Sequence, residues 1–146
     1  MPCDFQDVHL EIHSTLDALD LVQAVTEHIA RRVGLDEEAL HWTTMAVRES
    51  VINAIVHGNK GDSAKLVFID FAATPDSDPD GLIVRVRDQG PGFDPGRLND
   101  PLTPDNVLKA SGRGIFLIRQ FMDHVSVERA RQGGMEVRML KHIRAS

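Results

Sequence analysis

Three polar side chains, Glu49, Asn53 and His57, recur four residues apart in the stretch from Ala46 to Asn59. At roughly 100° per residue, steps of four residues drift by only about 40°, so the three side chains share one stripe of a helix. A carboxylate, a carboxamide and an imidazole on one stripe are groups that can bind a metal ion or a polar ligand. This stripe is the first candidate site.

Apolar residues flank the stripe on both sides, which is typical of a largely buried helix. They are Met45, Ile52 and Val56 on one side, and Val47, Val51, Ala54 and Ile55 on the other. Burying three polar groups is costly unless partners satisfy them. The stripe is therefore expected to face a polar cavity, a ligand or a metal ion. The competing interpretation is the solvated face of an ordinary amphipathic helix.

A glycine-rich segment follows an alternating strand pattern, in which Asp88 precedes Gly90-Pro91-Gly92. The carboxylate of Asp88 is expected at a strand end where the backbone turns sharply. Glycine there permits positive φ or the close approach of a ligand ring. Taken alone, Asp-x-Gly-x-Gly is a weak signal, because plain turns use the same residues.

A second glycine-rich segment, Gly112-Arg113-Gly114, comes directly before a predicted helix. Free amides at a helix start form a natural phosphate cradle. The segment lacks the Gly-Lys-Ser/Thr ending of a Walker A loop and the third glycine of the dinucleotide fingerprint. The alternative interpretation is a glycine-softened helix entry.

Together, the stripe and the two glycine segments resemble, in order and spacing, the N-box and the two glycine boxes of the GHKL ATP-binding superfamily with the Bergerat fold. The resemblance implies that Asn53 coordinates Mg²⁺ through its carbonyl oxygen and that Glu49 activates the attacking hydroxyl or water. It implies that Asp88 accepts a hydrogen bond from the exocyclic amine of adenine. The other implied ATP contacts are His57, Gly90, Gly92, Phe93, Ser111, Gly112, Arg113, Gly114 and Ile115. His57 is equally explained as a C-terminal helix cap.

Within the superfamily, the chain resembles the small serine kinases that act as anti-sigma factors in bacterial sporulation and stress switches. The resemblance rests on Glu-Ser-Val-x-Asn-Ala-x-x-His-Gly, on Ser-Gly-x-Gly, and on the region from Phe121 to Val125. It implies a protein serine/threonine kinase that binds a sigma factor and phosphorylates an anti-anti-sigma (STAS-type) partner. Such kinases are commonly homodimers.

Two residues depart from the family pattern. Ala110 stands where the family often has an arginine, with Lys109 and Arg113 close enough in sequence to supply charge. Met135 stands where a threonine usually supports the adenine site. Reduced nucleotide affinity or an altered water network is therefore expected.

Composition fits one soluble domain over residues 1–146, with 42% hydrophobic and 26% charged residues. A formal net charge of −6 argues against a nucleic-acid backbone as the main partner. The lone Cys3 cannot form an internal disulfide. No signal peptide or membrane-spanning run is visible, so a cytoplasmic location is expected.

The order of predicted elements is strand, two helices, two strands, a long loop, helix, two strands. The strands are predicted at 8–13, 65–72, 82–87, 125–129 and 136–143 and the helices at about 15–33, 37–58 and 115–122. Ser14 or Thr15 and Asp36 are the predicted caps, while Gly34 and then Gly58, Asn59 and Gly61 are the predicted stops. This order predicts an α+β two-layer sandwich with helices on one face of a mixed, mainly antiparallel sheet.

Two connections have alternative interpretations. Residues 74–81 contain Asp-x-Asp-x-Asp-Gly, but Arg87 occupies the closing acid position of a calcium loop, so a hairpin turn is favoured. The loop from Gln89 to Lys109 is long for a compact domain, which is typical of a loop that is either functional or mobile.

Two other functions compete with the kinase. One is an ATP-dependent partner-binding module with little phosphate transfer, which would not need Glu49. The other is an orphan catalytic domain of a histidine kinase. Against this function counts the observation that nothing before the first strand resembles a phospho-accepting helical hairpin.

Overall fold

The computed structural model describes residues 7–74, 81–91, 113–131 and 133–143. Five strands in these ranges span Val8–His13 (β1), Leu66–Ala73 (β2), Gly81–Arg87 (β3), His124–Arg129 (β4) and Met135–His142 (β5). The α-helices span Leu19–Val33 (α1), Glu37–Asn53 (α2) and Arg113–Phe121 (α4). A 3-10 turn, Leu16–Ala18 (η1), precedes α1, and a π-helical turn, Ala54–Gly58 (η2), follows α2.

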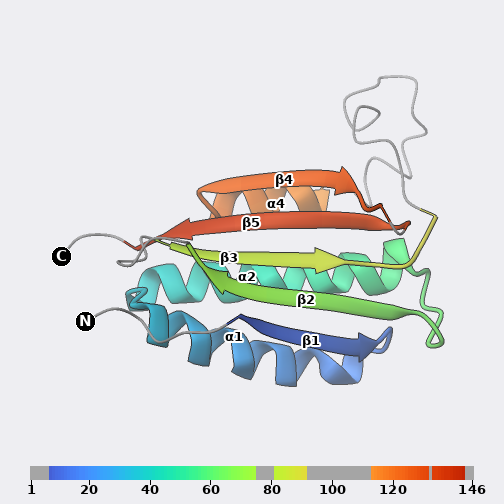
Figure 1. Ribbon diagram of the computed structural model, residues 1–146, viewed down its shortest axis with the longest axis horizontal. Coiled ribbons are helices and arrows are strands. Elements are labelled where there is room, and N and C mark those ends of the chain that lie inside the picture. Colours follow the sequence, from blue (N-terminus) through green and yellow to red (C-terminus); the bar gives the residue numbers. More distant parts are fainter. Residues whose placement is uncertain (1–6, 75–80, 92–112, 132, 144–146) are drawn as a thin grey trace.

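The strands form one sheet in the order β1-β2-β3-β5-β4. Each neighbouring pair of the described strands is antiparallel, so the expected mixed sheet is antiparallel instead. All three α-helices cover one face of it (Figure 1). The predicted α+β two-layer arrangement is confirmed, and β3, which ends at the candidate site, lies at the centre of the sheet.

The hydrophobic core lies between the sheet and the helices. Strand side chains alternate between two faces, so every second residue of the central strands points at the helices. These fully buried residues are Val67, Ile69 and Phe71 of β2 and Leu82, Val84 and Val86 of β3. The predicted inner face of α1 is confirmed at Leu19, Val22, Ile29 and Val33, and Val25 is half-buried.

The start of the first helix differs from the prediction. Thr15 lies at the cap position of η1, but its side chain makes no capping hydrogen bond. The Ser14 hydroxyl instead donates to the carbonyl of Lys65 at 2.8 Å. Leu16, predicted on the inner face, is 54% exposed, because the tighter 3-10 turn breaks the helical period there.

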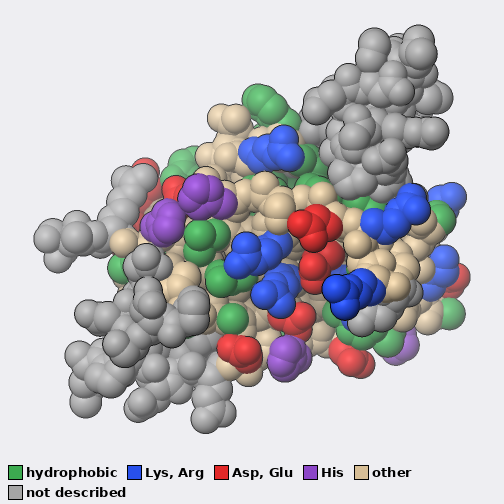
Figure 2. All heavy atoms as spheres, turned by 45° about the horizontal axis from the view of Figure 1, so that its top comes forward, with side chains coloured by type: hydrophobic (Ala, Val, Ile, Leu, Met, Phe, Trp, Pro, Cys, Tyr) green, Lys and Arg blue, Asp and Glu red, His purple; other side chains and the backbone are tan. Residues whose placement is uncertain are grey.

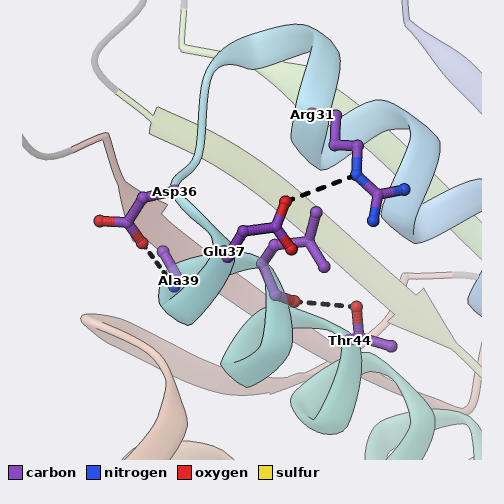
Figure 3. A network of polar contacts seen from close by, with 6 residues as sticks. Arg31, Asp36, Glu37, Ala39 and Thr44 are labelled. Atoms are coloured by element: carbon purple, nitrogen blue, oxygen red, sulfur yellow. Dashed lines mark hydrogen bonds and ion pairs between the residues drawn. The ribbon is translucent and has the colours of Figure 1, made fainter.

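The joint between α1 and α2 is set by local capping (Figure 3). Gly34 ends α1 with a φ of 98°, a left-handed conformation that favours glycine. Asp36 then caps α2, since its Oδ1 accepts a hydrogen bond from the Ala39 N–H at 2.7 Å. The ion pair between Arg31 and Glu37 is long, at 3.8 Å, and exposed, so it adds little. Both predicted signals at this joint are confirmed, and they orient the helix that carries Glu49 and Asn53.

The opposite face of the sheet carries charged side chains (Figure 2). The alternation places there Glu11, Asp70, Arg85, Arg87, Glu136 and Arg138. The guanidinium of Arg87 lies 4.1 Å from the centroid of the Phe68 ring. An antiparallel sheet commonly packs one face and leaves the other in water. Separately, no helix in the described ranges is both long and apolar enough to cross a bilayer.

Candidate functional site

The helix that carries the polar stripe ends in a π-helical turn. The Asn59 N–H donates to the carbonyl of Ala54 at 2.8 Å, five residues earlier. The predicted end at Gly58 is confirmed, but the last turn is wider than an α-turn. A π-turn inside a helix is rare and is often found at functional sites, because it changes the direction of the side chains that follow.

Two of the three residues of the predicted polar stripe share one face of α2. Glu49 and Asn53 lie one turn apart on α2 and are both half-buried, whereas His57 lies on the π-turn and is exposed. The flank facing the sheet is buried as predicted. The other flank is not, since Met45 and Val56 are 40% and 43% exposed. Ile52 of this flank is half-buried against the core, so α2 leaves only part of that flank in solvent.

Asn53 has an unsatisfied polar atom. Its Nδ2 is buried and finds no hydrogen-bond partner in the described part of the chain. Leaving such a group unpaired costs about 1–3 kcal/mol. A half-turn about the last side-chain bond exchanges the amide nitrogen and oxygen, so the side chain can offer either a donor or an acceptor. Asn53 thus fits a site that a bound molecule or hydrated cation completes.

Asp88 follows β3 directly and is only 5% exposed. Its Oδ1 accepts hydrogen bonds from the N–H groups of Gly90, at 2.9 Å, and Met135, at 3.1 Å. Within the described ranges Oδ2 receives no hydrogen bond. Burial raises the pKa of Asp88, and the two N–H bonds and the charges of Lys65 and Arg87 oppose that rise in part. One carboxylate oxygen is therefore fixed by the protein, and the other is available to a ligand.

Three glycines enclose this carboxylate. A Cβ on Gly58 would lie 2.1 Å from Asp88 Oδ2, and a Cβ on Gly134, whose φ is 81°, would lie 2.0 Å from the Asp88 carbonyl oxygen. A Cβ on Gly90 would lie 1.7 Å from the Gly58 carbonyl oxygen. The glycines therefore allow backbone to approach backbone, so the end of the α2–η2 helix rests directly on the turn after Asp88.

The helix α4 begins at Arg113, where the second glycine segment was expected to open a helix. The first four N–H groups of a helix have no partner within it, so the first turn of a helix is a place where a ligand can find N–H donors. Ile115 is 7% exposed and belongs to the hydrophobic core, which leaves only its backbone N–H for a ligand. The side chain of Arg113 is outside the description.

The packing of α4 on α2 brings that helix start toward the stripe. The rings of Trp42 and Phe121 stack with centroids 5.0 Å apart, which joins the end of α4 to the first half of α2. The two helices run in opposite directions (Figure 1). At about 1.5 Å per residue, the nine residues of α4 reach back to the level of Glu49 and Asn53. Along the helix axes, the start of α4 therefore lies within about one turn of Glu49 and Asn53.

Several predicted residues lie outside the described ranges. They are Gly92, Phe93, Ala110, Ser111 and Gly112, together with most of the 89–109 loop and the Asp-rich residues 75–80.

Sequence analysis missed one polar residue of the site. Asn59, expected only to help stop the helix, has a φ of −86° and a fully buried side chain that bonds three segments. An asparagine after glycine at a helix end looks like an ordinary stop, and no local signal reveals its burial.

The described ranges hold no group of three or more His, Cys, Asp or Glu side chains arranged around a metal ion. A cation beside Asn53 would therefore need most of its oxygen ligands from water and from a bound phosphate, as Mg²⁺ commonly does.

Comparisons with known proteins agree with this architecture. The family model of the histidine kinase-like ATPase domain matches residues 12–141, and the chain belongs to that family. It is 28% identical over 142 residues to the serine-protein kinase RsbW of Listeria monocytogenes, covering 93% of this chain and 87% of that protein. It is 37% identical over 103 residues to an anti-sigma F factor of Geobacillus thermodenitrificans, covering 68% of this chain and 67% of that protein.

Two solved structures share the fold. The RsbU and RsbW domains of a Mycobacterium tuberculosis protein superpose with a TM-score of 0.69 at 17% identity, covering 97% of this chain and 34% of that chain. The match thus spans about a third of that two-domain chain. A mycobacterial sensor histidine kinase, MprB, superposes with a TM-score of 0.56 at 17% identity, covering 95% and 100%. These identities show a common fold only.

Proposed function

We propose that this protein is a Mg²⁺- and ATP-dependent serine/threonine-protein kinase that acts as an anti-sigma factor. Its partners would be a sigma factor and an anti-anti-sigma protein of the STAS type, which it would phosphorylate. The observation that carries the proposal is one helix, α2 with η2, that presents Glu49 and Asn53 one turn apart and rests on Asp88 through Gly58. The similarity to RsbW kinases and an anti-sigma F factor supports the choice of partners.

Each residue in this proposal has a role that its surroundings suit. Asp88 would accept a hydrogen bond from the adenine amine at Oδ2, the oxygen that no described group occupies. Asn53 would turn its carbonyl oxygen to Mg²⁺, and its buried Nδ2, unpaired in the described ranges, would donate to an oxygen of the bound nucleotide or of a metal-bound water. The free N–H groups at the start of α4 would bind phosphate oxygens.

Phosphoryl transfer needs positioning, charge neutralisation and a base. Asn53 would hold Mg²⁺, which when bound would neutralise charge on the phosphates. The partner's serine hydroxyl oxygen forms a bond to the γ-phosphorus while the bond from that phosphorus to the bridging oxygen of ADP breaks. Glu49 takes the hydroxyl proton.

Nucleotide binding is the first test. Calorimetry of Mg²⁺-ATP binding should give a clear signal for the wild type and none for Asp88→Asn, whose amide would place an N–H where the adenine amine donates. A wild type that binds no ATP in this assay would overturn the proposal and leave a nucleotide-independent interaction module.

The kinase step needs a second test, because an ATP-dependent binding module would pass the first. STAS-type proteins of the source organism are incubated with the chain and Mg²⁺-ATP, and phosphoserine or phosphothreonine is detected by mass spectrometry. Glu49→Gln should keep ATP affinity within about threefold and lower transfer by about 10²–10⁴-fold. Transfer that survives the substitution would remove Glu49 from the mechanism.

A further inference from the structure

Asn59 is the most completely bonded buried side chain at the site. Its Oδ1 accepts from the Gln89 N–H at 2.7 Å, and its Nδ2 donates to Ser14 Oγ at 2.7 Å and to the Leu66 carbonyl at 3.0 Å. Its exposure is 0%. Both amide hydrogens and one carbonyl lone pair are therefore used inside the protein.

The geometry requires a carboxamide at this position. An aspartate is the same size but has no donor, so its second oxygen would face the Leu66 carbonyl and Ser14 Oγ, whose hydrogen already goes to the Lys65 carbonyl. A leucine would leave the Gln89 N–H buried without an acceptor. Only a side chain with a donor and an acceptor on one short stem joins these groups.

The side chain of Gln89 adds a second link between the turn after Asp88 and the start of β2. The β2–β3 register ends with Phe68 opposite Arg87, and its continuation would put Leu66 opposite Gln89. There the Gln89 side-chain oxygen accepts from the Leu66 N–H at 2.7 Å. The backbone at Gln89 is therefore held by Asn59, and its side chain by the start of β2.

These bonds act on the residues beside the carboxylate. Asn59 follows Gly58, whose Cα lies against Asp88 Oδ2, and Gln89 follows Asp88 directly. The Asn59–Gln89 bond thus joins the two chain segments whose contact fixes where Oδ2 lies. Moving either segment moves the oxygen that would meet the adenine amine.

We propose that Asn59 is a positioning residue that sets Asp88 Oδ2 for the nucleotide base and so determines the preference for a purine with a 6-amino group. The inference rests on the proposed ATP-binding function. A residue that only braced the fold would, when replaced, weaken binding of every nucleotide equally. A positioning residue would change the preference between bases.

The test compares two triphosphates by calorimetry in the presence of Mg²⁺: ATP, and purine riboside triphosphate, which lacks the 6-amino group. The wild type should prefer ATP by about 10- to 100-fold, the range of one hydrogen bond to a charged group. Asn59→Asp should lower ATP affinity at least about tenfold and purine riboside triphosphate affinity less than about threefold.

Thr26→Val is the matched control. Thr26 is also fully buried, and its hydroxyl donates to the Val22 carbonyl at 2.7 Å within α1. Its loss should lower the melting temperature by circular dichroism and leave the preference between the triphosphates unchanged.

The outcomes separate the possible failures. A wild type that binds neither triphosphate overturns the proposed function and this inference with it. A wild type that binds both equally overturns the base-reading role of Asp88, and therefore this inference. A wild type that prefers ATP, with the same preference in Asn59→Asp, overturns this inference alone.

If Asn59→Asp does not fold, Ser14→Ala decides the question, because it removes one partner of Asn59 and leaves the Leu66 carbonyl. The preference should then fall about threefold or more. Hydrogen exchange of the Gly90 N–H, which donates to Asp88 Oδ1, should quicken in the free variant. An unchanged preference together with unchanged exchange would overturn the proposal.

Discussion

The two ends of the candidate site differ in how completely the protein satisfies its own polar groups. At the Asp88 end, Oδ1 accepts two backbone N–H groups, and three glycines bring backbone into contact around the carboxylate. At the Asn53 end, the amide nitrogen is buried and has no partner in the ranges that the structure describes. One end is built before a ligand arrives, and the other is left for a ligand to complete.

This difference has an energetic consequence. A prearranged acceptor costs a ligand little ordering, so the Asp88 end is suited to selecting the base. An unpaired buried amide destabilises the free protein by about 1–3 kcal/mol, and that cost is removed when a ligand supplies a partner. The Asn53 end is thus suited to coupling binding to the presence of metal and phosphate.

The largest expected effect comes from breaking the prearranged end with Gly58→Ala. The added Cβ would lie 2.1 Å from Asp88 Oδ2, and its nearest contacts all belong to the short Asp88 side chain, so Asp88 must move. We expect ATP affinity to fall by about a hundredfold or more in calorimetry, the loss of a charged hydrogen bond and its surroundings.

The control for this variant is Gly34→Ala. Gly34 has a φ of 98° and no atom within 4 Å of an added Cβ. The substitution should destabilise the fold by about 1–2 kcal/mol through backbone strain and leave ATP affinity unchanged. Equal losses of affinity in both variants would mean that general destabilisation, rather than contact with Asp88, explains the result.

Asn53→Ala tests the end of the site where the amide is unpaired in the described ranges. Removing the unpaired amide should leave the thermal stability of the free protein unchanged or raise it by about 1 kcal/mol. The dependence of ATP affinity on Mg²⁺, measured with and without EDTA, should shrink by about 10- to 100-fold. A destabilised free protein with intact Mg²⁺ dependence would show that Asn53 is a structural residue.

Sequence reasoning was most successful where local chemistry decides the outcome. The Gly34 stop, the Asp36 cap and the strands β2 and β3 depend on residues close in the chain, and all are confirmed. It failed where contacts distant in sequence decide. The π-turn and the burial of Asn59 follow from packing against residues some thirty positions away, as the Asn59–Gln89 bond does.

The raised pKa of Asp88 gives the Asp88 end of the site a pH dependence, which acts first on the stability of the fold. Burial raises the pKa of Asp88, so in the folded protein the carboxyl stays protonated at pH values where the unfolded chain has lost the proton. Its contribution to stability is therefore present below the unfolded pKa and is lost as pH rises through the folded pKa.

ATP binding has the opposite sign, because the adenine amine needs an ionised acceptor. Below the raised pKa of Asp88, ATP affinity should fall about tenfold per pH unit. Purine riboside triphosphate carries the same phosphates and serves as the reference in calorimetry from about pH 4.5 to about pH 7.5, a range that lies above the ordinary pKa of aspartate. Parallel pH profiles for the two triphosphates would exclude Asp88 as the titrating group.

The smallest expected effect is that of Met135→Thr, which restores the threonine typical of the resembling family. Met135 is buried, but both of its bonds to Asp88 come from its backbone: its N–H donates to Oδ1 at 3.1 Å, and its carbonyl accepts from the Asp88 N–H at 3.0 Å. Any side chain keeps these bonds, so Asp88 should stay in place and ATP affinity should change by less than about fivefold, in the direction of tighter binding, since a hydroxyl adds at most one neutral hydrogen bond. A larger gain in calorimetry would mean that the thioether itself obstructs the base, and that the prearranged end is less complete than its hydrogen bonds indicate.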